Sequence, residues 1–420
     1  MRAELSYSAS RTARRVLVQV ALAGVLFATV PSSTAAVAGK TAWAVIKCKF
    51  SDQPQEPAFD PLFLTAPDGL AGYWSDVSYG QITLDGSAVY GWFTLPFTLA
   101  ESNSKTRGEI IDACKAAAAG VDFSQFYSVI AVLNAVRDSG SADGKVLLDP
   151  NSLYISFATH EMGHGYGLDH SLDDTGTIYD PSSDTRPGAY GDGWDIMSAM
   201  NFGGAAPTYT IRFGPSGPGL NALNLDKLGW LAPNRVLTWN GSAQNLTLAA
   251  LNHPEAPGFL TAKVPFDPGN ANHYYTVEFR RQTGWDRAIP RDTVLIHELR
   301  ADGLSYLIKA NGGAERLPGQ TFHDVQNNLA ITALTFDAAS STATVNIGRD
   351  QVWVDFSWPG QPTLPEDGSQ GSPFNSLAEG LAAVGYGGTL KFRPGSSHET
   401  ATINKRVTLV AVGGPVTLGQ

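Results

Sequence analysis

Three histidines and a glutamate stand close together in the stretch HEMGHGYGLDH, which occupies residues 160–170. On a helix, His160 and His164 lie one turn apart on the same face, so both imidazoles can reach one ion. Gly167 permits a positive φ, with which the chain can leave the helix and turn back. His170 then becomes the third ligand. Three neutral imidazoles with one open position describe a catalytic zinc site rather than a closed structural one.

Glu161 follows His160 in the helical rotation, beside the ion and free to hold its water. Zinc lowers the pKa of a bound water to about 7 and polarises a carbonyl group. A carboxylate in this place can take the proton of the attacking water and later pass a proton to a leaving amine. The pattern His-Glu-x-x-His alone occurs by chance in many helices, whereas the added glycine and third histidine make it specific. The stretch therefore predicts one catalytic Zn²⁺ and peptide-bond hydrolysis with Glu161 as the general base.

The complete pattern resembles the zinc signature of the metzincin peptidases. Metzincins also carry a methionine turn beneath the zinc, and the segment DIMS at 195–198 resembles it. The resemblance implies that Met197 gives the histidines an apolar floor and binds no metal. Three further segments are similar to the immune-inhibitor-A-like and gametolysin-like peptidases: YWSDVSYG at 73–80, YGDGWDIMSAM at 190–200 and LDKLGWL at 225–231. Residues that look like the β-domain following the catalytic domain in that family are Tyr275, Glu278, Arg280, Gly284, Asp286 and 294–297. The resemblance covers residues 40–350.

The chain also departs from the family. Several metzincins place a tyrosine two residues past the methionine, where it supports the oxyanion, but Ala199 stands at that position here. An arginine or tyrosine from elsewhere would have to replace it. Few residues separate the predicted export signal from the first strand, so no inhibitory prodomain is expected. Cys48 lacks the surroundings of a cysteine switch.

The N-terminus has the pattern of an export signal. Basic residues precede an apolar stretch at 16–30, and the small residues at 36–38 provide a cleavage site. We predict a signal peptide at 1–38 and a mature chain that is secreted or periplasmic. The alternative, a short membrane anchor, is disfavoured because the apolar stretch is short and a cleavage site follows it. No later stretch is apolar for long enough to span a bilayer.

Two cysteines remain after export, Cys48 and Cys114. In an oxidising compartment an even pair suggests one disulfide, which would join the first strand to a helix. Two separately buried thiols are the alternative, since sequence gives no distance between them.

Composition limits the class of protein and its partners. Hydrophobic residues make up 43% of the 420 residues and charged residues 16%, so sizeable cores can form. The 44 glycines and 25 prolines favour turns and short strands over long helical bundles. The net charge of -10 argues against nucleic acid or an anionic membrane as the main partner. A protein or glycoprotein substrate is expected instead.

The mixture of strand-like and helix-like segments in residues 39–233, together with the family resemblance, predicts an α/β (α+β) metzincin-like catalytic domain. The sequence predicts strands at 41–50 and 127–135 and helices at 106–120 and 153–167.

Residues 234–350 predict an antiparallel, sandwich-like β-domain. Its short β-branched or aromatic segments lie at 245–250, 273–280, 293–299, 329–336 and 342–347. A linker is predicted at 351–373, followed by a segment at 374–420 that resembles the first coils of a parallel β-helix. In that segment a helix is expected at 374–384, with strands at 389–393, 400–403 and 406–411. It is either an appended packing or polysaccharide-binding module or a truncated relic.

Other polar residues have two interpretations each. Carboxylates crowd the stretch after the zinc helix and could hold a structural Ca²⁺, or they form a solvated acidic loop. They are Asp169, Asp173, Asp174, Asp180, Asp184 and Asp192. The remaining histidines are expected to be structural. They are His253, His273, His297, His323 and His398.

The leading hypothesis is a secreted zinc metalloendopeptidase. An alternative from another class is an adhesive or polysaccharide-binding secreted protein whose metzincin-like domain is catalytically weak. The intact Glu161 disfavours this alternative, because a domain freed from catalysis needs no carboxylate beside the water. A zinc hydrolase acting on a non-peptide amide is a third hypothesis, which the sequence leaves open.

Overall fold

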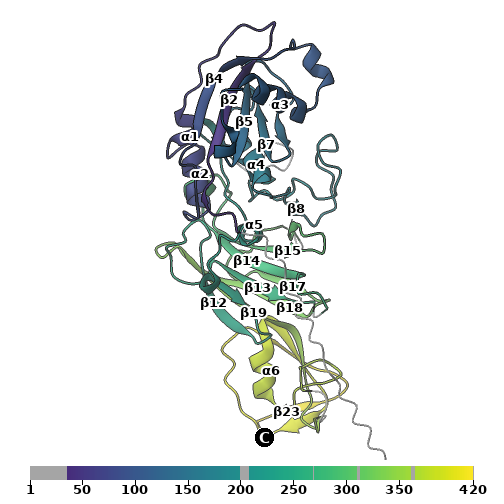
Figure 1. Cartoon of the computed structure of the whole chain (residues 1–420). Helices are drawn as coiled ribbons and strands as arrows, with labels where there is room; N and C mark the ends of the chain where they lie inside the picture. The colour runs from purple at the N-terminus through teal and green to yellow at the C-terminus, as the bar shows by residue number, and fades with distance from the viewer. Residues whose placement is uncertain (1–35, 199–207, 268, 310–312, 361–364, 420) are drawn as a thin grey trace, which may run out of the picture. The chain divides into compact units, whose positions relative to one another are not determined.

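A five-stranded sheet forms the centre of the first part of the chain (Figure 1). The computed structural model describes residues 36–198, 208–267, 269–309, 313–360 and 365–419. Nearly all of the predicted signal peptide, and Ala199, lie outside these residues. The strands in spatial order are β4 (Ala88–Thr94), β2 (Trp43–Lys49), β5 (Ser128–Leu133), β7 (Lys145–Leu148) and β6 (Gly140–Ala142). The first four are parallel, and β6 runs antiparallel at one edge.

Helices cover both faces of this sheet because β2 and β5 are apolar on both sides. Helix α3 (Arg107–Ala117) begins at a capping box formed by Thr106 and Glu109 and packs on one face. Helices α2 (Leu70–Val77) and α4 (Ile155–Gly165) share the core of the opposite face. The predicted strands and helices of this part are present, with ends shifted by a few residues. Short elements are α1 (Leu62–Thr65), α5 (Ala222–Lys227), β1 (Gly39–Lys40), β3 (Ile82–Thr83), β9 (Tyr209–Ile211) and β10 (Gly214–Ser216).

The predicted disulfide between Cys48 and Cys114 is confirmed, with the two Cα atoms 5.9 Å apart. It joins β2 to α3 within the core on the α3 face of the sheet. The bond therefore fixes that helix to β2, the first long strand of the chain, as the sequence suggested.

The second part of the chain forms two sheets around one apolar core. The first contains, in spatial order, β11 (Val236–Thr238), β13 (Thr261–Pro265), β14 (Tyr274–Arg280), β15 (Thr293–Leu299), β16 (Ser305–Leu307) and β8 (Leu172–Asp173). The second contains β17 (Thr321–Asp324), β18 (Leu329–Asp337) and β19 (Thr342–Val354), and β12 (Gln244–Ala249) also pairs with β19. All five strands predicted here are found. Strand β8 was not predicted, and it comes from the segment just after α4.

Parallel pairs dominate the C-terminal segment. The elements are α6 (Leu377–Ala383), β20 (Val384–Phe392), β21 (Gly395–Ser397), β22 (Thr408–Ala411) and β23 (Val416–Leu418). Strand β20 pairs in parallel with β19 and with β22, and β21 pairs in parallel with β23.

Two predictions for this region are wrong. The linker does not begin at 351, because β19 continues to Val354, where Val352 and Val354 are buried and pair with β20. The strand at 400–403 is absent: these residues are exposed and form no strand, and Ile403 is 43% exposed.

The predicted domains are joined by shared strands. Strand β8 lies within the range predicted for the first domain, but it pairs with β16 in the first sheet of the second part of the chain. Strand β19 belongs to the second sheet and to the C-terminal parallel array. These connections explain why Ala35–Gln420 forms a single unit.

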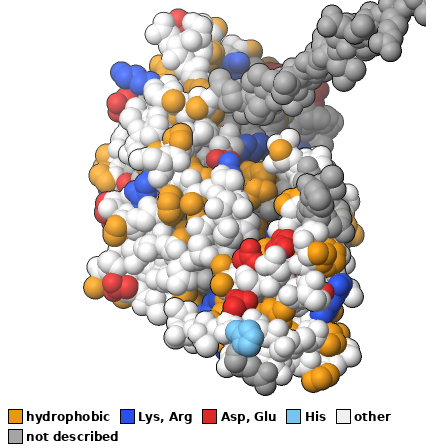
Figure 2. Space-filling view, turned by 90° about the horizontal axis from the view of Figure 1, so that it is seen from below, with side chains coloured by type: hydrophobic (Ala, Val, Ile, Leu, Met, Phe, Trp, Pro, Cys, Tyr) orange, Lys and Arg blue, Asp and Glu red, His pale blue; other side chains and the backbone are white. Residues whose placement is uncertain are grey.

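No helix among the described residues is both long and apolar enough to cross a bilayer. On the face that Figure 2 shows, acidic and basic side chains are interspersed and are separated by uncharged and hydrophobic surface.

Candidate active site

Helix α4 carries the first two histidines and the glutamate. Ile155, Ala158 and Met162 occupy one side of the helix and enter the core beneath the sheet. This burial turns His160 and His164 toward the opposite side. After the helix ends at Gly165, Gly167 adopts a φ of 90°, as predicted, and the chain turns back toward the helix.

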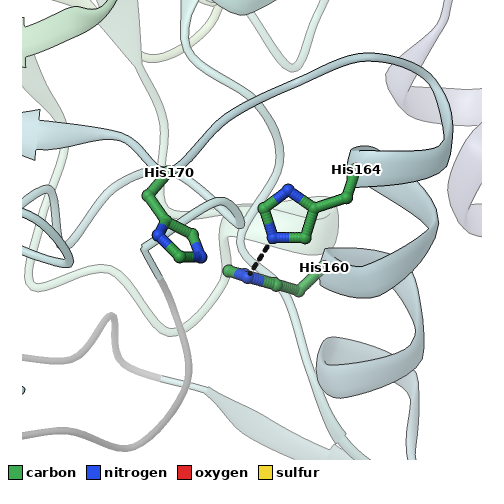
Figure 3. Close-up of side chains that lie close together, drawn as sticks. All are labelled: His160, His164 and His170. Atoms are coloured by element: carbon green, nitrogen blue, oxygen red, sulfur yellow. Dashed lines mark hydrogen bonds between the residues drawn. The ribbon is translucent and has the colours of Figure 1, made fainter. Parts of the chain in front are cut away.

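The three histidines converge (Figure 3). Their ring centroids are 4.9 Å apart for His160 and His164, 4.9 Å for His164 and His170, and 5.4 Å for His160 and His170. One nitrogen from each ring lies within 4.8 Å of the nitrogens of the other two. The Nε2 atoms of His160 and His164 are 3.2 Å apart. Two ligands about 2.1 Å from one zinc ion are about 3.4 Å apart at a tetrahedral angle, so this separation suits a shared ion.

Each histidine uses its other ring nitrogen for a hydrogen bond. The Nδ1 atoms of His160 and His164 lie 2.8 Å and 2.9 Å from the carbonyl oxygens of Ile196 and Leu168. The Nδ1 of His170 lies 2.7 Å from a carboxylate oxygen of Asp184. Because carbonyls and carboxylates only accept, the three Nδ1 atoms must be the donors. The lone pairs are then on the Nε2 atoms, which is the arrangement of metal-ligating histidines.

Burial keeps these imidazoles neutral. It lowers the pKa of His160 well below its usual value, and neighbouring His164 and His170 lower it further. Burial likewise lowers the pKa of His164 to about 4. The pKa of His170 also falls, because burial outweighs the opposing charge of Asp184. Neutral imidazole is the form that binds a metal ion.

Glu161 is 4% exposed and lines the same cavity as the histidines. Burial raises its pKa to about 7, while the charge of Arg107 and hydrogen bonds from Ser141 lower it in part. A divalent cation held by the neighbouring histidines would lower this pKa again and favour the carboxylate. A proton acceptor tuned near neutral pH suits general-base catalysis.

Met197 packs against α4 and is fully buried. A Cβ atom on Gly163 would overlap its Sδ atom, so a larger residue at 163 would force the Met197 side chain to move. Asp195 accepts a hydrogen bond of 2.6 Å from the Met197 amide and fixes the turn. The turn in turn supplies the Ile196 carbonyl to His160. Met197 therefore packs against the helix that carries His160 and His164, and its role as an apolar floor for a metal site stays a prediction.

The loop after α4 holds His170 through an ion-pair cluster. Arg186 lies 2.7 Å from Asp169 and 2.5 Å from Asp184, and Asp184 contacts His170. Burial alone would raise the pKa of Asp184, but hydrogen bonds from Arg186 and His170 outweigh it and hold this pKa well below its usual value. Asp184 is thus charged at neutral pH, and sequence reasoning did not find its role.

The predicted calcium site receives no support from the described residues. There, the three histidines are the sole group of metal-binding side chains close enough to share an ion. Asp169 and Asp184 bind Arg186, and Asp173 binds Lys309 at 2.6 Å. These pairs also differ from the solvated loop that was the alternative, because Asp173 and Asp184 are buried.

Strands of the first sheet in the second part of the chain contact the segments that carry the site. Strand β8 begins two residues after His170 and pairs with β16. His297 of β15 is fully buried, with its Nε2 3.0 Å from Asp192 and its Nδ1 3.6 Å from Glu278. Glu278 also accepts a 2.6 Å hydrogen bond from the amide of Ala222, which begins α5. Four histidines outside the cluster of His160, His164 and His170 contact carboxylates, which agrees with structural roles. They are His253, His273, His297 and His323.

Tyr190 was also missed as a site residue. Its hydroxyl lies 3.0 Å from the Nε2 of His170 and 2.6 Å from the Oγ of Ser183. Burial raises the pKa of Tyr190 to about 12, so the phenol is protonated. Tyr190 is the first residue of the segment 190–200 that is similar to the family. Its spacing from the histidines does not indicate that it lies in the site.

The site opens into a cavity of about 560 Å³. Its wall includes Ser139 and Ser141, on or beside the edge strand β6. The outer edge of β6 pairs with no other strand in the described part of the chain. The other lining residues are Arg107, Asp138, Phe157, His160, Glu161, His164, His170, Asp180, Ser182, Ser183 and Tyr190.

Comparison with known proteins adds little to this geometry. No protein-family model matches the chain, and no curated protein matches it. Among solved structures, one crystal form of wild-type OgpA from Akkermansia muciniphila is similar with a TM-score of 0.30 and 10% identity, covering 76% of this chain and 96% of that one. A second crystal form of OgpA gives a TM-score of 0.29 and 12% identity, covering 76% and 97%. Because TM-scores this low carry no conclusion, the function rests on the site itself.

Proposed function

We propose that this protein is a zinc-dependent endopeptidase with a metzincin-like catalytic domain. The observation that carries the proposal is the convergence of three neutral histidines beside a buried glutamate in one open cavity. His160, His164 and His170 would hold the ion through their Nε2 atoms. When bound, zinc lowers the pKa of a water molecule to about 7 and polarises the carbonyl to be attacked.

The donor set favours zinc over harder cations. Three imidazole nitrogens suit zinc and other first-row transition metals, whereas calcium and magnesium prefer oxygen ligands. The set leaves a coordination position for water or substrate, as catalytic zinc sites do. The hydrogen bonds on all three Nδ1 atoms orient the rings before metal arrives.

Glu161 would move the protons of the reaction. Its carboxylate takes a proton from the attacking water, whose oxygen forms a bond to the carbonyl carbon. The same proton then passes to the amine nitrogen as the carbon–nitrogen bond breaks. General-base help of this kind typically contributes about 10²–10⁴ in rate.

Strand β6 gives a reason to propose an extended peptide as substrate. A free strand edge can pair with an added strand through main-chain hydrogen bonds. Ser141 lies on this strand and also contacts Glu161, so a peptide paired with β6 would pass the base. A peptide bound along this edge would extend past the histidines on both sides, which supports our proposal of endopeptidase action on protein or glycoprotein.

The disulfide supports secretion, because such bonds persist in oxidising compartments.

The adhesive or polysaccharide-binding alternative rests on the C-terminal parallel strands alone. The buried Glu161 favours catalysis, since burying an ionisable group costs free energy that a binding module has no need to spend.

Casein cleavage by the secreted chain tests the proposal. We expect cleavage that stops with a zinc chelator, returns with added Zn²⁺ and falls at least 10²-fold in Glu161→Gln. Glu56→Gln is the matched control, because Glu56 is an exposed residue that pairs with Lys49. Cleavage that survives the chelator, or equal cleavage by Glu161→Gln, would contradict the mechanism. A filled zinc site without cleavage of any protein or peptide would favour the binding alternative.

A further inference from the structure

Tyr190 has a backbone conformation that residues other than glycine rarely adopt. Its hydroxyl points into the site formed by the three histidines. Its φ is 65°, in the left-handed region, and the residue is 3% exposed. Its ring packs on His170 with centroids 4.2 Å apart. Backbone strain of this kind is concentrated at active sites and ligand clamps, where a side chain must be aimed. The observation therefore raises the question of what the hydroxyl does.

The distances place the phenol oxygen within reach of whatever lies at the ion. Two atoms held about 2.1 Å from one metal are about 3.0 Å apart at a right angle and about 3.4 Å apart at a tetrahedral angle. The Tyr190 hydroxyl is 3.0 Å from the His170 Nε2 atom, and the His160 and His164 Nε2 atoms are 3.2 Å apart. The hydroxyl is therefore close enough to the Nε2 of His170 to reach a group bound at the ion, and Tyr190 lines the cavity that opens onto the three histidines.

Ser183 gives this hydroxyl a second partner. Its Oγ lies 2.6 Å from the Tyr190 oxygen, and both residues line the cavity. The phenol now donates to the Nε2 lone pair of His170, which a bound zinc ion would occupy. Its O–H would then donate to another oxygen at the site, while the contact with Ser183 stays.

We propose that Tyr190 is a catalytic residue that donates a hydrogen bond to the oxygen of the scissile carbonyl as that oxygen becomes negative. The inference rests on the proposed peptidase function. As the water oxygen bonds to the carbonyl carbon, the π pair of the C=O bond moves onto oxygen and the water proton moves to Glu161. Tyr190 keeps its proton throughout and contributes only the hydrogen bond. It fills the role that Ala199 cannot, from a position ahead of the methionine turn rather than after it.

Tyr190→Phe tests the assignment, with Tyr90→Phe as the matched control. Tyr90 lies on β4, where its ring packs on Phe126, away from the cavity. We expect Tyr190→Phe to lower kcat about 10²–10³-fold, as the loss of one oxyanion donor does elsewhere. KM and the dissociation constant for Zn²⁺ should stay within about threefold of wild type, and Tyr90→Phe should match wild type in all three.

Binding to an inactive protein gives a readout independent of turnover. In the Glu161→Gln background, a phosphinic peptide built on a cleavage sequence of the wild type imitates the tetrahedral oxygen. Adding Tyr190→Phe should weaken its binding about 10²-fold while leaving the binding of the uncleaved substrate peptide unchanged.

The outcomes separate this inference from the function on which it depends. Unchanged kcat and unchanged phosphinic-peptide binding in Tyr190→Phe would overturn the role of Tyr190 and leave the peptidase intact. Loss of zinc from Tyr190→Phe would also overturn it, because the tyrosine would then be a structural ligand. Failure of the wild type to cleave any peptide would overturn both proposals.

Discussion

Removing the carboxylate of Asp184 should weaken zinc binding without unfolding the protein. Asp184 accepts a 2.7 Å hydrogen bond from the Nδ1 of His170 and fixes which nitrogen of that ring faces the ion. In Asp184→Ala, the ring can rotate and its Nε2 lone pair is no longer held toward His160 and His164. Arg186 keeps its pair with Asp169, so the loop retains one of its two ion pairs.

The expected size follows from the character of this bond. A hydrogen bond to a charged group contributes about 1.5–3 kcal/mol, and the Asp184 side chain is only 7% exposed, so solvent compensates little. That range corresponds to about 10–150-fold in a dissociation constant. It agrees with the roughly 10–100-fold loss seen when the partner of a metal-bound histidine is removed.

Competition with a chromophoric chelator measures the zinc dissociation constant of each variant. Asp112→Ala is the matched control, because Asp112 is an exposed carboxylate that pairs with Lys145 and does not line the site. We expect a change below about threefold for this control. Asp184→Asn should lie between the two, since an amide oxygen still accepts the hydrogen bond but lacks the charge. Equal zinc affinity for Asp184→Ala and wild type would refute the reasoning.

Three further predictions concern the parts that hold the site. Gly163→Ala places a methyl group against Met197 Sδ and should cost about 1–3 kcal/mol of stability by overpacking; an unchanged Tm would contradict the contact. Replacing both Cys48 and Cys114 by serine opens a crosslink spanning 66 residues and should cost about 4 kcal/mol in denaturant unfolding, and a cost near zero would show that the bond is absent or unimportant. Burial alone would lower the pKa of His297, but the charges of Glu278 and Asp192 outweigh it and raise this pKa above 6.5. The charged His297 therefore adds stability that is fully present below about pH 6.5 and is lost as pH rises through the folded value. At pH 6, His297→Gln should cost about 3–5 kcal/mol, because it leaves buried carboxylates without their cation. The difference from wild type should shrink as pH increases toward 9, and a constant difference would contradict the pairing.

Local spacing predicted the parts of the site that lie on one helix or one turn beyond it. The i, i+4 relation of His160 and His164 and the positive φ of Gly167 follow from helix geometry and glycine chemistry. The position of Met197 followed from the family resemblance and not from any period in the sequence. These features depend on short segments of the chain, which is why they could be predicted from the sequence.

Asp184 and Tyr190 could not be predicted because their positions depend on long loops and on tertiary contacts. The loop from 169 to 190 is shaped by the Arg186 ion pairs and by β8, which joins a sheet whose other strands come more than 60 residues later. No periodicity in the loop encodes that pairing. The wrong linker boundary has a similar cause, since β19 is extended by its parallel partner β20, which the local sequence does not reveal.

Equilibrium zinc binding to the purified secreted chain tests the central claim most directly. We predict one Zn²⁺ per chain, no measurable loss in Glu161→Gln, and loss of tight binding when His160, His164 or His170 is changed singly to alanine. Zinc bound equally well after removal of any of these histidines, or no zinc bound by the wild type, would contradict the account.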